Sequence, residues 1–579
     1  MSIVCRVLVN NAKCRTIATF PGRRSQSTKL KPQLATTNGF LKSSFLDVPI
    51  PETNLAEYAM EFYGDYADRI ALECGITGRN YTFDEVRVKS RNLNKTLRKK
   101  LKLQRGDVVA LFLPNIPEFP ICVFGSILAG LKVTTLNPAY TPDEIHRQLV
   151  DSGAKIIITI NPLYQNCNKA IDKLDKKIPI SIIKEKQDEL LPQGTINFKE
   201  LIDEKLDLPD ITNLSPDDTA FLPYSSGTTG LPKGVMLSNR NLVGNIQQIG
   251  SDETKFAKLP DGSHQDCYPS ILPLFHIYGF TSSVSLLRTG CKTVTLSKFT
   301  PELYIQTIIK HKPNILMLVP PIVLFLSAHP AVKTEYFANL ETTMCGAAPL
   351  GPLDEQKFRE KVAKPCTILQ GYGLTEASPV VTQMPTALQG KYVGSMGHPV
   401  SLTEVKVVDI NDPELKHLGP NQTGELLVKG PQVMQGYHNK PKETEETFID
   451  GWLRTGDMVY YNEDLLFFIA DRIKELIKVK GFQVPPAELE QLIRDFPGIQ
   501  DAAVIGVPHP INGEAPRAYI VPKQGQKVDV NKLKEFVESK VAKHKKLSGG
   551  ISIVDSIPKN ASGKTLRKEL KNKFEKEGI

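Results

Sequence analysis

A run of hydroxyl groups, glycines and one lysine occupies residues 224–234, which read YSSGTTGLPKG. Gly227 and Gly230 carry no side chain, so backbone amides beside them can approach phosphate oxygens. Lys233 adds a positive charge, and four further residues add hydroxyl donors: Ser225, Ser226, Thr228 and Thr229. These features predict a loop that wraps a polyphosphate such as ATP. The alternative is a solvated linker, because the same residue types are common in loops.

This loop lacks the spacing of a Walker A motif, since Lys233 follows Pro232 rather than a glycine. The GKT at 563–565 also fails, because Pro558 stands where the upstream glycine is required. The spacing therefore disfavours a P-loop NTPase.

A second run, QGYGLTE, occupies residues 370–376. Its two glycines let a flat ring or a phosphate lie against the backbone, which makes Gln370, Gly371 and Tyr372 candidate nucleotide contacts. Thr375 could donate to a phosphate oxygen. Glu376 is a hard oxygen ligand suited to Mg²⁺, which prefers a carboxylate together with substrate phosphates. The alternative is that Glu376 is a solvated charge at the start of a helix.

A third pair of segments, GWLRTGDM and DRIKELIKVKGFQV, covers 451–458 and 471–484. Asp457 could accept hydrogen bonds from both ribose hydroxyls, since a carboxylate has two acceptor oxygens. Arg472 could hold the sugar or a phosphate with its forked donors. The alternative interpretation is a turn aspartate and a surface arginine.

A fourth run, PKNASGKTLRKEL, covers residues 558–570. Lys564 lies within a turn of small residues, where an ammonium group could enter a closed site. The later lysines are typical of a solvated helix face.

These four runs, in this order, resemble the adenylate-forming superfamily of acyl-CoA synthetases, firefly luciferases and plant coumarate-CoA ligases. The resemblance extends from about Tyr81 to Leu570, and three further segments share it: LNPAYTPDE (136–144), PLFHIYG (273–279) and GAAPLG (346–351). The last two lean toward the coumarate ligase and luciferase branch.

The resemblance implies a two-step reaction with ATP and CoA as co-substrates and Mg²⁺ as cofactor. A carboxylate attacks the α-phosphorus of ATP and expels pyrophosphate, and the CoA thiolate then displaces AMP to give a thioester. Such an attack needs charge cancellation and alignment more than acid–base chemistry.

The resemblance also implies roles for individual residues. The catalytic group comprises Lys564, Thr375, Glu376 and His276. Asp457 would hold the ribose, and Arg472 and Lys478 the adenylate, with Lys474 at a hinge near 471–474. The CoA channel would contain Lys480, Gly481 and Phe482. The acyl pocket would contain His276, Tyr278, Phe280, Gly346 and Ala347.

The predicted function is an ATP-dependent acid:CoA ligase acting on a fatty or aryl-alkenoic acid. Met344 lies where plant coumarate ligases tend to place a lysine near the phenol, which favours an aliphatic acid. The alternatives are a luciferase-like adenylate oxygenase and a catalytically inactive binding protein of the same fold. Amino-acid adenylation is disfavoured, because no aspartate stands in 273–279 to meet an α-ammonium group.

The composition limits the class of protein and the compartment in which it is expected. The chain has 579 residues, 23% charged and 41% hydrophobic, and no apolar run approaches the roughly 20 residues that span a bilayer. Its 9 cysteines show no C-x-x-C spacing, which favours reduced thiols and an intracellular compartment. The first acidic residue is Asp47, and eight basic residues precede it.

This basic, hydroxyl-rich beginning predicts a mitochondrial targeting leader over 1–30, with a peroxisomal or cytoplasmic location as the alternative. Without those eight residues the formal net charge of +9 falls close to zero, so no nucleic-acid partner is expected. The oligomeric state is left open.

The elements that must position these motifs alternate along the chain. Strands over 108–113, 133–136 and 155–160, with helices over 119–129 and 142–152 between them, predict a parallel sheet with crossover helices. The same alternation occurs again, with strands over 293–296 and 315–319 on either side of a helix over 301–311. Shorter strands follow from about residue 400, including 424–429 and 465–470.

The predicted fold class is α/β. A large N-terminal domain over 31–470 contains doubly wound sheets and a small β-rich subdomain, and a hinge follows over 471–474. A small, mobile α+β domain over 475–579 carries the catalytic lysine, with strands over 502–507 and 518–522 and a helix over 530–543.

Overall fold

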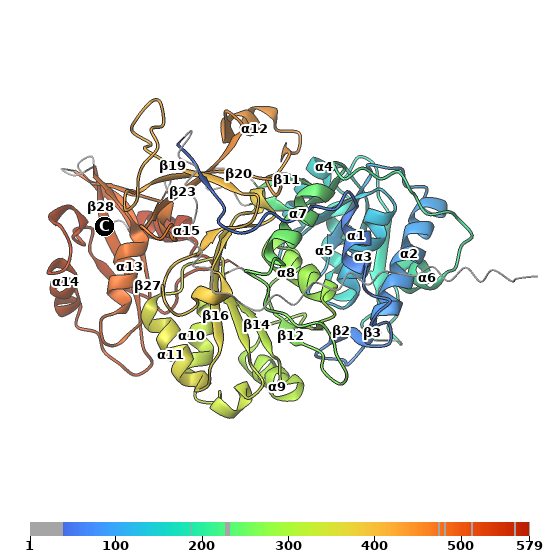
Figure 1. The fold of residues 1–579 in the computed structure, drawn as a ribbon, viewed down its shortest axis with the longest axis horizontal. Coiled ribbons are helices and arrows are strands. Elements are labelled where there is room, and N and C mark those ends of the chain that lie inside the picture. Colours follow the sequence, from blue (N-terminus) through green and yellow to red (C-terminus); the bar gives the residue numbers. More distant parts are fainter. Residues whose placement is uncertain are drawn as a thin grey trace, which may run out of the picture. The chain divides into compact units, whose positions relative to one another are not determined.

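The structure is a computed structural model, shown in Figure 1. It describes the following residues: 39–186, 188–225, 232–472, 475–479, 482–510, 513–560 and 563–577. The predicted leader over 1–30 lies outside the described residues.

A nine-stranded sheet forms the first layer of the large domain. Its order is β10 (Tyr224–Ser225), β11 (Lys233–Ser238), β9 (Thr219–Leu222), β5 (Lys132–Thr135), β4 (Val108–Phe112), β6 (Ala154–Ile160), β7 (Ile180–Ile183) and β8 (Ile196–Asn197), with β21 (Gly436–Tyr437) beside β11. The pairs from β9 through β5, β4, β6 and β7 to β8 are parallel, as the alternation along the sequence predicts.

Helices cover both faces of this sheet. Val109 and Leu111 of β4 pack with the fully buried helix α3 (Glu118–Leu128), whereas Ala110 and Phe112 pack in a second cluster with α4 (Pro142–Ser152) and α5 (Tyr164–Ile171). Successive residues of a strand point to opposite faces, so an unbroken apolar strand needs an apolar partner on each side. Outside α3 lie α2 (Phe83–Lys99) and α6 (Phe198–Asp203), as Figure 1 shows.

Two further sheets complete the α/β part. One has the order β12 (Cys267–Ser270), β13 (Lys292–Thr295), β2 (Ile70–Cys74) and β3 (Asn80–Thr82). The other has the order β14 (Ile315–Leu318), β15 (Thr342–Cys345), β16 (Thr367–Gly373), β17 (Val380–Gln383) and β18 (His398–Pro399). The strands predicted over 293–296 and 315–319 therefore lie in different sheets, joined by the helix α9 (Pro301–His311).

Proline placement explains where several helices begin. Pro320 and Pro321 end the strand β14 and open the helix α10 (Pro320–Ala328), and Pro352 opens α11 (Pro352–Val362). Proline is favoured in the first turn of a helix because its fixed φ suits the helix and its missing N–H has no partner there in any case.

The β-rich subdomain is a six-stranded antiparallel sheet. Its order is β1 (Leu41–Lys42), β19 (Glu404–Val408), β20 (Gly424–Lys429), β23 (Trp452–Tyr461) and β22 (Phe448–Ile449), with β24 (Phe467–Arg472) paired to β23. The strand predicted over 465–470 is displaced, because Leu465 adopts a φ of 57° in the turn before β24.

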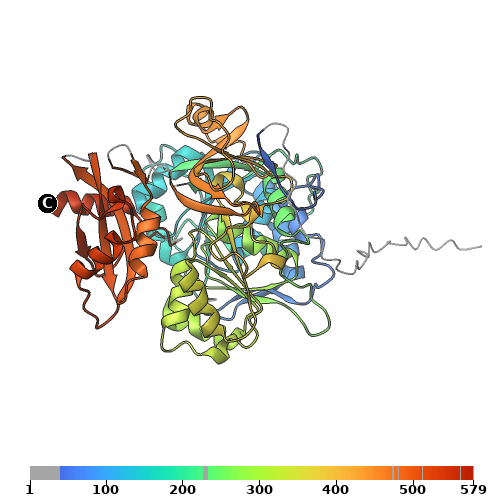
Figure 2. The ribbon, with the colours of Figure 1, turned by 60° about the vertical axis from the view of Figure 1, so that its left-hand side comes forward.

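The small C-terminal part has its own sheet and core, and Figure 2 shows it as one group of red elements. Its strands are β25 (Ile477–Val479), β26 (Phe482–Val484), β27 (Ile499–His509), β28 (Gly513–Pro522) and β29 (Ile551–Ile553). Its helices are α13 (Pro486–Arg494), α14 (Val530–Glu538) and α15 (Arg567–Glu577). The helix predicted over 530–543 is too long, because Ser539 caps it and donates its hydroxyl to the Phe536 carbonyl.

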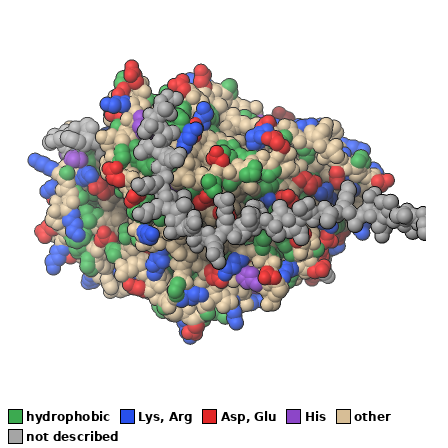
Figure 3. Space-filling view, viewed as in Figure 1, with side chains coloured by type: hydrophobic (Ala, Val, Ile, Leu, Met, Phe, Trp, Pro, Cys, Tyr) green, Lys and Arg blue, Asp and Glu red, His purple; other side chains and the backbone are tan. Residues whose placement is uncertain are grey.

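The surface carries mixed charge. Figure 3 shows acidic and basic side chains interspersed on the face it draws. Among the described residues, no helix combines the length and apolarity that crossing a bilayer would require.

Candidate active site

A short hairpin brackets the predicted phosphate loop. Tyr224 and Ser225 of β10 pair with Gly234 and Lys233 of β11, so the two ends of the loop lie side by side. The Tyr224 hydroxyl donates to Asp151 over 2.6 Å, which ties the hairpin to the helix α4. Four predicted contacts fall outside the described residues: Ser226, Gly227, Thr228 and Thr229.

The structure brings the first and second motifs together at Glu376. Ser225 Oγ and the Tyr437 hydroxyl each donate to Glu376 Oε1 over 3.0 Å. Thr375 and Glu376 begin a 3₁₀ turn (Thr375–Ala377) after β16, and the two hydroxyl donors show that Glu376 is more than a solvated charge. Burial, and secondly the charge of Glu376, raise the pKa of Tyr437 well above its usual value, so its hydroxyl stays protonated as a donor.

Tyr437 is a site residue that the sequence motifs do not reveal. It stands on β21, whose register places it opposite Val235 of β11, and its ring centre lies 4.8 Å from Lys233 Nζ. A lysine ammonium over an aromatic face is electrostatically favourable. Tyr437 thus contacts both the phosphate-loop hairpin and the carboxylate.

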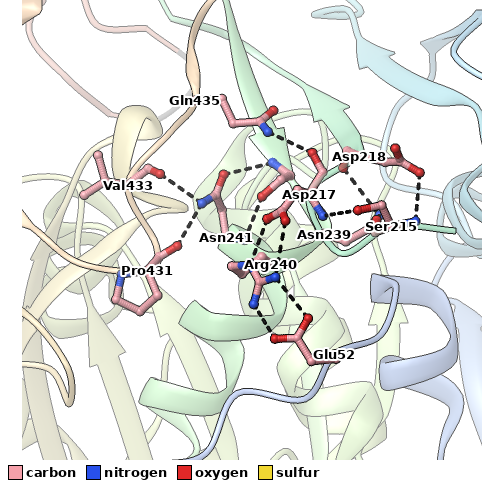
Figure 4. A network of polar contacts seen from close by, with 11 residues as sticks. Glu52, Ser215, Asp217, Asp218, Asn239, Arg240, Asn241, Pro431, Val433 and Gln435 are labelled. Atoms are coloured by element: carbon pink, nitrogen blue, oxygen red, sulfur yellow. Dashed lines mark hydrogen bonds and ion pairs between the residues drawn. The ribbon is translucent and has the colours of Figure 1, made fainter.

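A polar network at the start of the helix α7 (Asn239–Ile249) holds the segment that carries Tyr437 (Figure 4). Asn241 Nδ2 donates to the carbonyls of Pro431 and Val433 over 2.8 and 2.9 Å. Gln435 Nε2 donates to the Asp217 carbonyl over 2.8 Å. Residues 431–435 are therefore fixed to α7 and to the segment before β9.

Asp457 lies in the strand β23 and is only 2% exposed, so it is not a turn aspartate. The Tyr372 hydroxyl donates to Asp457 Oδ2 over 2.6 Å, which connects the second motif to the third. Arg472 of β24 is the residue directly opposite Asp457 in the strand pairing. Its side chain lies outside the described part.

The side chain of Gln370 is hydrogen-bonded to Leu350. Its Oε1 accepts from the Leu350 amide over 3.0 Å, and its Nε2 donates to the Leu350 carbonyl over 3.3 Å. The side chain thus binds the GAAPLG segment, and the predicted nucleotide contact of Gln370 stays a prediction. A β-carbon placed on the neighbouring Gly371 would lie 2.8 Å from Met344 Cε and 3.0 Å from the Thr382 carbonyl oxygen, so a side chain there would force a neighbour to shift.

The predicted acyl pocket is only partly assembled as one cluster. A β-carbon on Gly346 would lie 3.0 Å from Tyr278 Cζ, and the Tyr278 hydroxyl donates to the Leu318 carbonyl over 3.4 Å. Ala347 has a φ of 69°, a strained conformation for a residue with a side chain. Phe280, in contrast, stacks on Phe221 at 4.3 Å inside the main core, apart from the Tyr278 cluster.

His276 is the N-terminal cap of the helix α8 (Ile277–Arg288). Its Nδ1 accepts from the Tyr278 amide over 3.3 Å. Burial lowers the pKa of His276 to about 4. The ring is therefore neutral at physiological pH and combines the predicted pocket position with a capping role.

Lys564 stands on a hydrogen-bonded turn of the small C-terminal part. Its backbone N–H donates to Asn560 Oδ1 over 2.9 Å, and its ammonium lies 3.9 Å from Glu475 Oε1. A β-carbon on Gly563 would lie 3.3 Å from Pro321 Cγ, so this turn contacts the start of α10 in the large domain.

Sequence and structure comparisons agree with this architecture. The model of the AMP-binding enzyme family matches residues 61–438, and that of the AMP-binding enzyme C-terminal domain matches 488–564. The chain belongs to the AMP-binding enzyme family. A 4-coumarate–CoA ligase 3 of Oryza sativa subsp. japonica is 38% identical over 544 residues, covering 92% of this chain and 94% of the relative.

Two further relatives show the same relation. This AMP-binding enzyme is 38% identical over 540 residues to a 4-coumarate–CoA ligase of Pinus taeda, covering 92% and 97% of the two chains. ATP-bound MatB of Rhodopseudomonas palustris superposes with a TM-score of 0.80 at 26% identity, covering 90% and 99%. The predicted superfamily, its coumarate ligase branch and the fold class are confirmed.

The segment predicted to meet CoA is only partly described in this AMP-binding enzyme. Lys478 of β25 donates its backbone N–H to Glu514 Oε2 over 2.7 Å, and its side chain is exposed. Phe482 begins β26 opposite Val479, with its side chain outside the described part. Three predicted residues lie wholly outside it: Lys474, Lys480 and Gly481.

A magnesium ion fits the chemistry of this site. The described residues contain no group of three or more histidine, cysteine or acidic side chains that would form a metal cage by themselves. Mg²⁺ needs no such cage, because it usually binds one or two carboxylates together with substrate phosphates and water. Glu376, beside the phosphate-loop hairpin, supplies such a carboxylate.

Proposed function

We propose that this chain, an ATP-dependent carboxylic acid–CoA ligase, activates an aliphatic acid of medium or greater length. The observation that carries the nucleotide chemistry is the convergence of Ser225 and Tyr437 on Glu376. It joins the phosphate-loop hairpin to a carboxylate 151 residues further along the chain.

The reaction consists of two displacements. In the first, an oxygen of the substrate carboxylate forms a bond to the α-phosphorus of ATP, and the bond to pyrophosphate breaks. In the second, the CoA sulfur forms a bond to the acyl carbon, and AMP leaves. Both steps join anionic partners, so positioned positive charge and hydroxyl donors lower the barrier.

Each part of the site has a task in the first displacement. Ser225 and the loop that follows bind the phosphates, and Asp457, oriented by Tyr372, accepts from the ribose. Lys564 brings an ammonium group to the negative charge that develops on the phosphoryl group. Glu376 would hold Mg²⁺, which neutralises phosphate charge when bound.

The aliphatic substrate is supported by the surroundings of Tyr278. Met344, Met317 and Met384 belong to the same apolar cluster, and Met344 Cε lies close to Gly371 of the second motif. Methionine side chains are flexible and adapt to a hydrocarbon chain. A substituted aromatic acid would instead call for a polar group, such as the lysine that coumarate ligases tend to place at Met344.

An aryl-alkenoic acid is the second candidate, because the relatives that are 38% identical are 4-coumarate–CoA ligases. Luciferase-like oxygenation and an inactive binding protein are not favoured, since these relatives are CoA ligases.

The test is pyrophosphate release from ATP with a panel of acids, including octanoate, palmitate, cinnamate and 4-coumarate, with and without CoA. We expect release that requires an acid and Mg²⁺, the highest kcat/KM with an aliphatic acid, and a thioester only when CoA is added. A preference for 4-coumarate would contradict the aliphatic proposal but not the ligase chemistry.

Two proposals concern organisation. Residues 1–30 direct the protein to mitochondria, supported by eight basic residues before the first acidic one, and residues 471–474 are the hinge between the large and small domains. A fusion of residues 1–47 to a fluorescent protein should enter mitochondria. The same fusion with these basic residues changed to glutamine should remain in the cytoplasm.

A further inference from the structure

The helix α11 begins very close to the helix α13 of the small C-terminal part. A β-carbon placed on Gly351, the residue before α11, would lie 2.6, 2.9 and 3.1 Å from Oε1, Nε2 and Cδ of Gln491. All three nearest atoms thus belong to one side chain of the other domain.

Two hydrogen bonds hold the side chain of Gln491. Arg494 Nη2 donates to Gln491 Oε1 over 3.0 Å, and Gln491 Nε2 donates to Asp495 Oδ1 over 3.2 Å. Both partners are in or directly after α13, so the amide is braced from its own side. A side chain at position 351 would have to displace this amide and thereby weaken its bonds to Arg494 and Asp495.

Neither the backbone nor the helix cap requires a glycine at 351. Its φ of −67° and ψ of 153° are available to any residue, so the conformational freedom of glycine is not needed. As the N-cap of α11 it provides no side-chain hydrogen bond, whereas Ser, Thr, Asn and Asp would. The close approach of Gln491, in contrast, disfavours any side chain at this position.

The helices α11 and α13 also carry oppositely charged side chains that interact, Asp354 and Arg494. Asp354, in the first turn of α11, has a side chain that is 15% exposed. Burial raises its pKa, and Arg494 of α13 opposes that rise most strongly, followed by Lys357. The carboxylate of the large domain and the guanidinium of the small part therefore attract each other.

A second glycine contact lies on the same side of the large domain. A β-carbon on Gly563 would lie 3.3 Å from Pro321 Cγ and 3.4 Å from Val319 Cγ2, at the end of β14. Gly563 directly precedes Lys564. The arrangement that brings Gln491 against Gly351 is thus the one that brings the lysine turn against the large domain.

We infer that Gly351 and Gln491, together with Asp354 and Arg494, form a docking contact that holds the small part in place for adenylation and separates before thioester formation. The inference rests on the proposed two-step function. These four are positioning residues, since they act by placing Lys564. In a rotated arrangement for the second step, position 351 would no longer face Gln491.

The test compares the two half-reactions in the full chain. Gly351→Val should lower ATP–pyrophosphate exchange roughly tenfold or more, because overpacking of this size is strongly unfavourable. Thioester formation from CoA and preformed acyl-adenylate should stay within about twofold of the wild type, since small surface changes away from a site have little effect. That retained activity also shows that the variant folds.

A double variant makes the test specific. Gln491→Ala removes all three atoms that the added β-carbon meets, so Gly351→Val with Gln491→Ala should regain most of the exchange activity. Gly64→Val is the matched control, because a β-carbon there meets nothing within 4 Å. Independently, Asp354→Arg should lower exchange, and adding Arg494→Asp should restore it.

Equal loss of both half-reactions, unchanged exchange in Gly351→Val, or no recovery in the double variant would overturn the inference while leaving the proposed function intact. Absence of exchange in the wild type with every acid would overturn the proposed function, and this inference with it.

Discussion

The two halves of the active site are built in different ways. In the large domain, Glu376 and Asp457 receive hydroxyl donors from other segments, through bonds of 2.6 to 3.0 Å that span 61 to 151 residues of sequence. In the small part, Lys564 and Arg567 pair with Glu475 inside the same domain. The large domain thus holds carboxylates with hydroxyl donors, whereas the small part holds a partly exposed cation through an ion pair.

This difference suits the two halves to different tasks: the large domain binds ATP, and the small part brings the Lys564 ammonium group to it. Groups that are buried and hydrogen-bonded in advance need little reorganisation when ATP binds. A cation that must reach the site only for one step is better held on its own domain, as Lys564 is, with its side chain 30% exposed. Changes in the large domain should therefore alter stability as well as activity, whereas changes in the small part should alter one half-reaction.

The sharpest test of this comparison is Lys564→Ala. Adenylation should fall roughly 10²–10³-fold, because a positioned donor to the developing charge is lost. Thioester formation from preformed acyl-adenylate should be retained, and the melting temperature should change little. Lys571→Ala, in the exposed face of α15, is the matched control. Equal loss of both half-reactions would contradict the view that Lys564 is delivered for one step.

The stability of the large domain should depend on pH through the buried His276. Burial lowers the pKa of His276 to about 4, so the folded protein favours the neutral ring. Its contribution is fully present above the unfolded pKa of about 6.5 and is lost as the pH falls through 4, amounting to about 3 kcal/mol at most.

His276→Asn tests this contribution, because asparagine can still cap α8 but does not titrate. Between pH 6.5 and 4, the free energy of unfolding of this variant should fall less steeply than that of the wild type. His398, whose pKa burial also lowers to about 4, remains in both proteins and cancels in the difference. Parallel curves would show that His276 does not titrate as expected.

Much of the fold could be predicted from the sequence. The helix α4 has its predicted span of 142–152, and the structure shows a capping box of Thr141 and Glu144 at its start and a left-handed Gly153 at its end. The predicted end of α14 is wrong. The helix ends at Ser539, whose hydroxyl bonds to the Phe536 carbonyl, and the sequence does not show whether a serine will make such a bond.

The site was predicted unevenly for a related reason. Glu376 and Asp457 stand in short runs of unusual composition, so the sequence points to them. Tyr437 and Glu475 have no such surroundings, and their importance comes from contacts with residues 61 and 89 or more positions away. When a common residue type becomes important only through a tertiary contact, the sequence around it contains no pattern that predicts its role.

Asp457→Ala should show both effects expected of the large domain. It removes the acceptor of the 2.6 Å bond from Tyr372, which should lower the free energy of unfolding by about 1–3 kcal/mol. It should also raise the KM for ATP, measured by pyrophosphate exchange. Tyr372→Phe separates the two, because it removes the same bond but keeps the carboxylate for the ribose. A similar KM increase in both variants would argue against ribose binding by Asp457.

Tyr437→Phe should have a smaller effect. It removes one of the two donors to Glu376 Oε1 while Ser225 and the ring over Lys233 remain. Loss of one hydrogen bond to a charged group corresponds to about 1.5 kcal/mol, or roughly tenfold in adenylation. The Mg²⁺ concentration needed for half-maximal exchange should shift as well. An unchanged metal dependence would separate Tyr437 from the metal site.

The smallest effect is expected from Glu475→Gln in the small part. Glu475 lies 3.9 Å from the Lys564 ammonium and 2.6 Å from Arg567, which is also held by Glu490, so neutralising Glu475 loosens Lys564 without freeing its turn. Adenylation should fall only a few-fold, because partly exposed ion pairs contribute about 1 kcal/mol or less. Glu488→Gln removes a comparable pair with Lys545 away from the turn and serves as the control. If Glu475→Gln lowered stability as much as Asp457→Ala, the small part would depend on its site residues for folding just as the large domain does, and the contrast between the two halves would be lost.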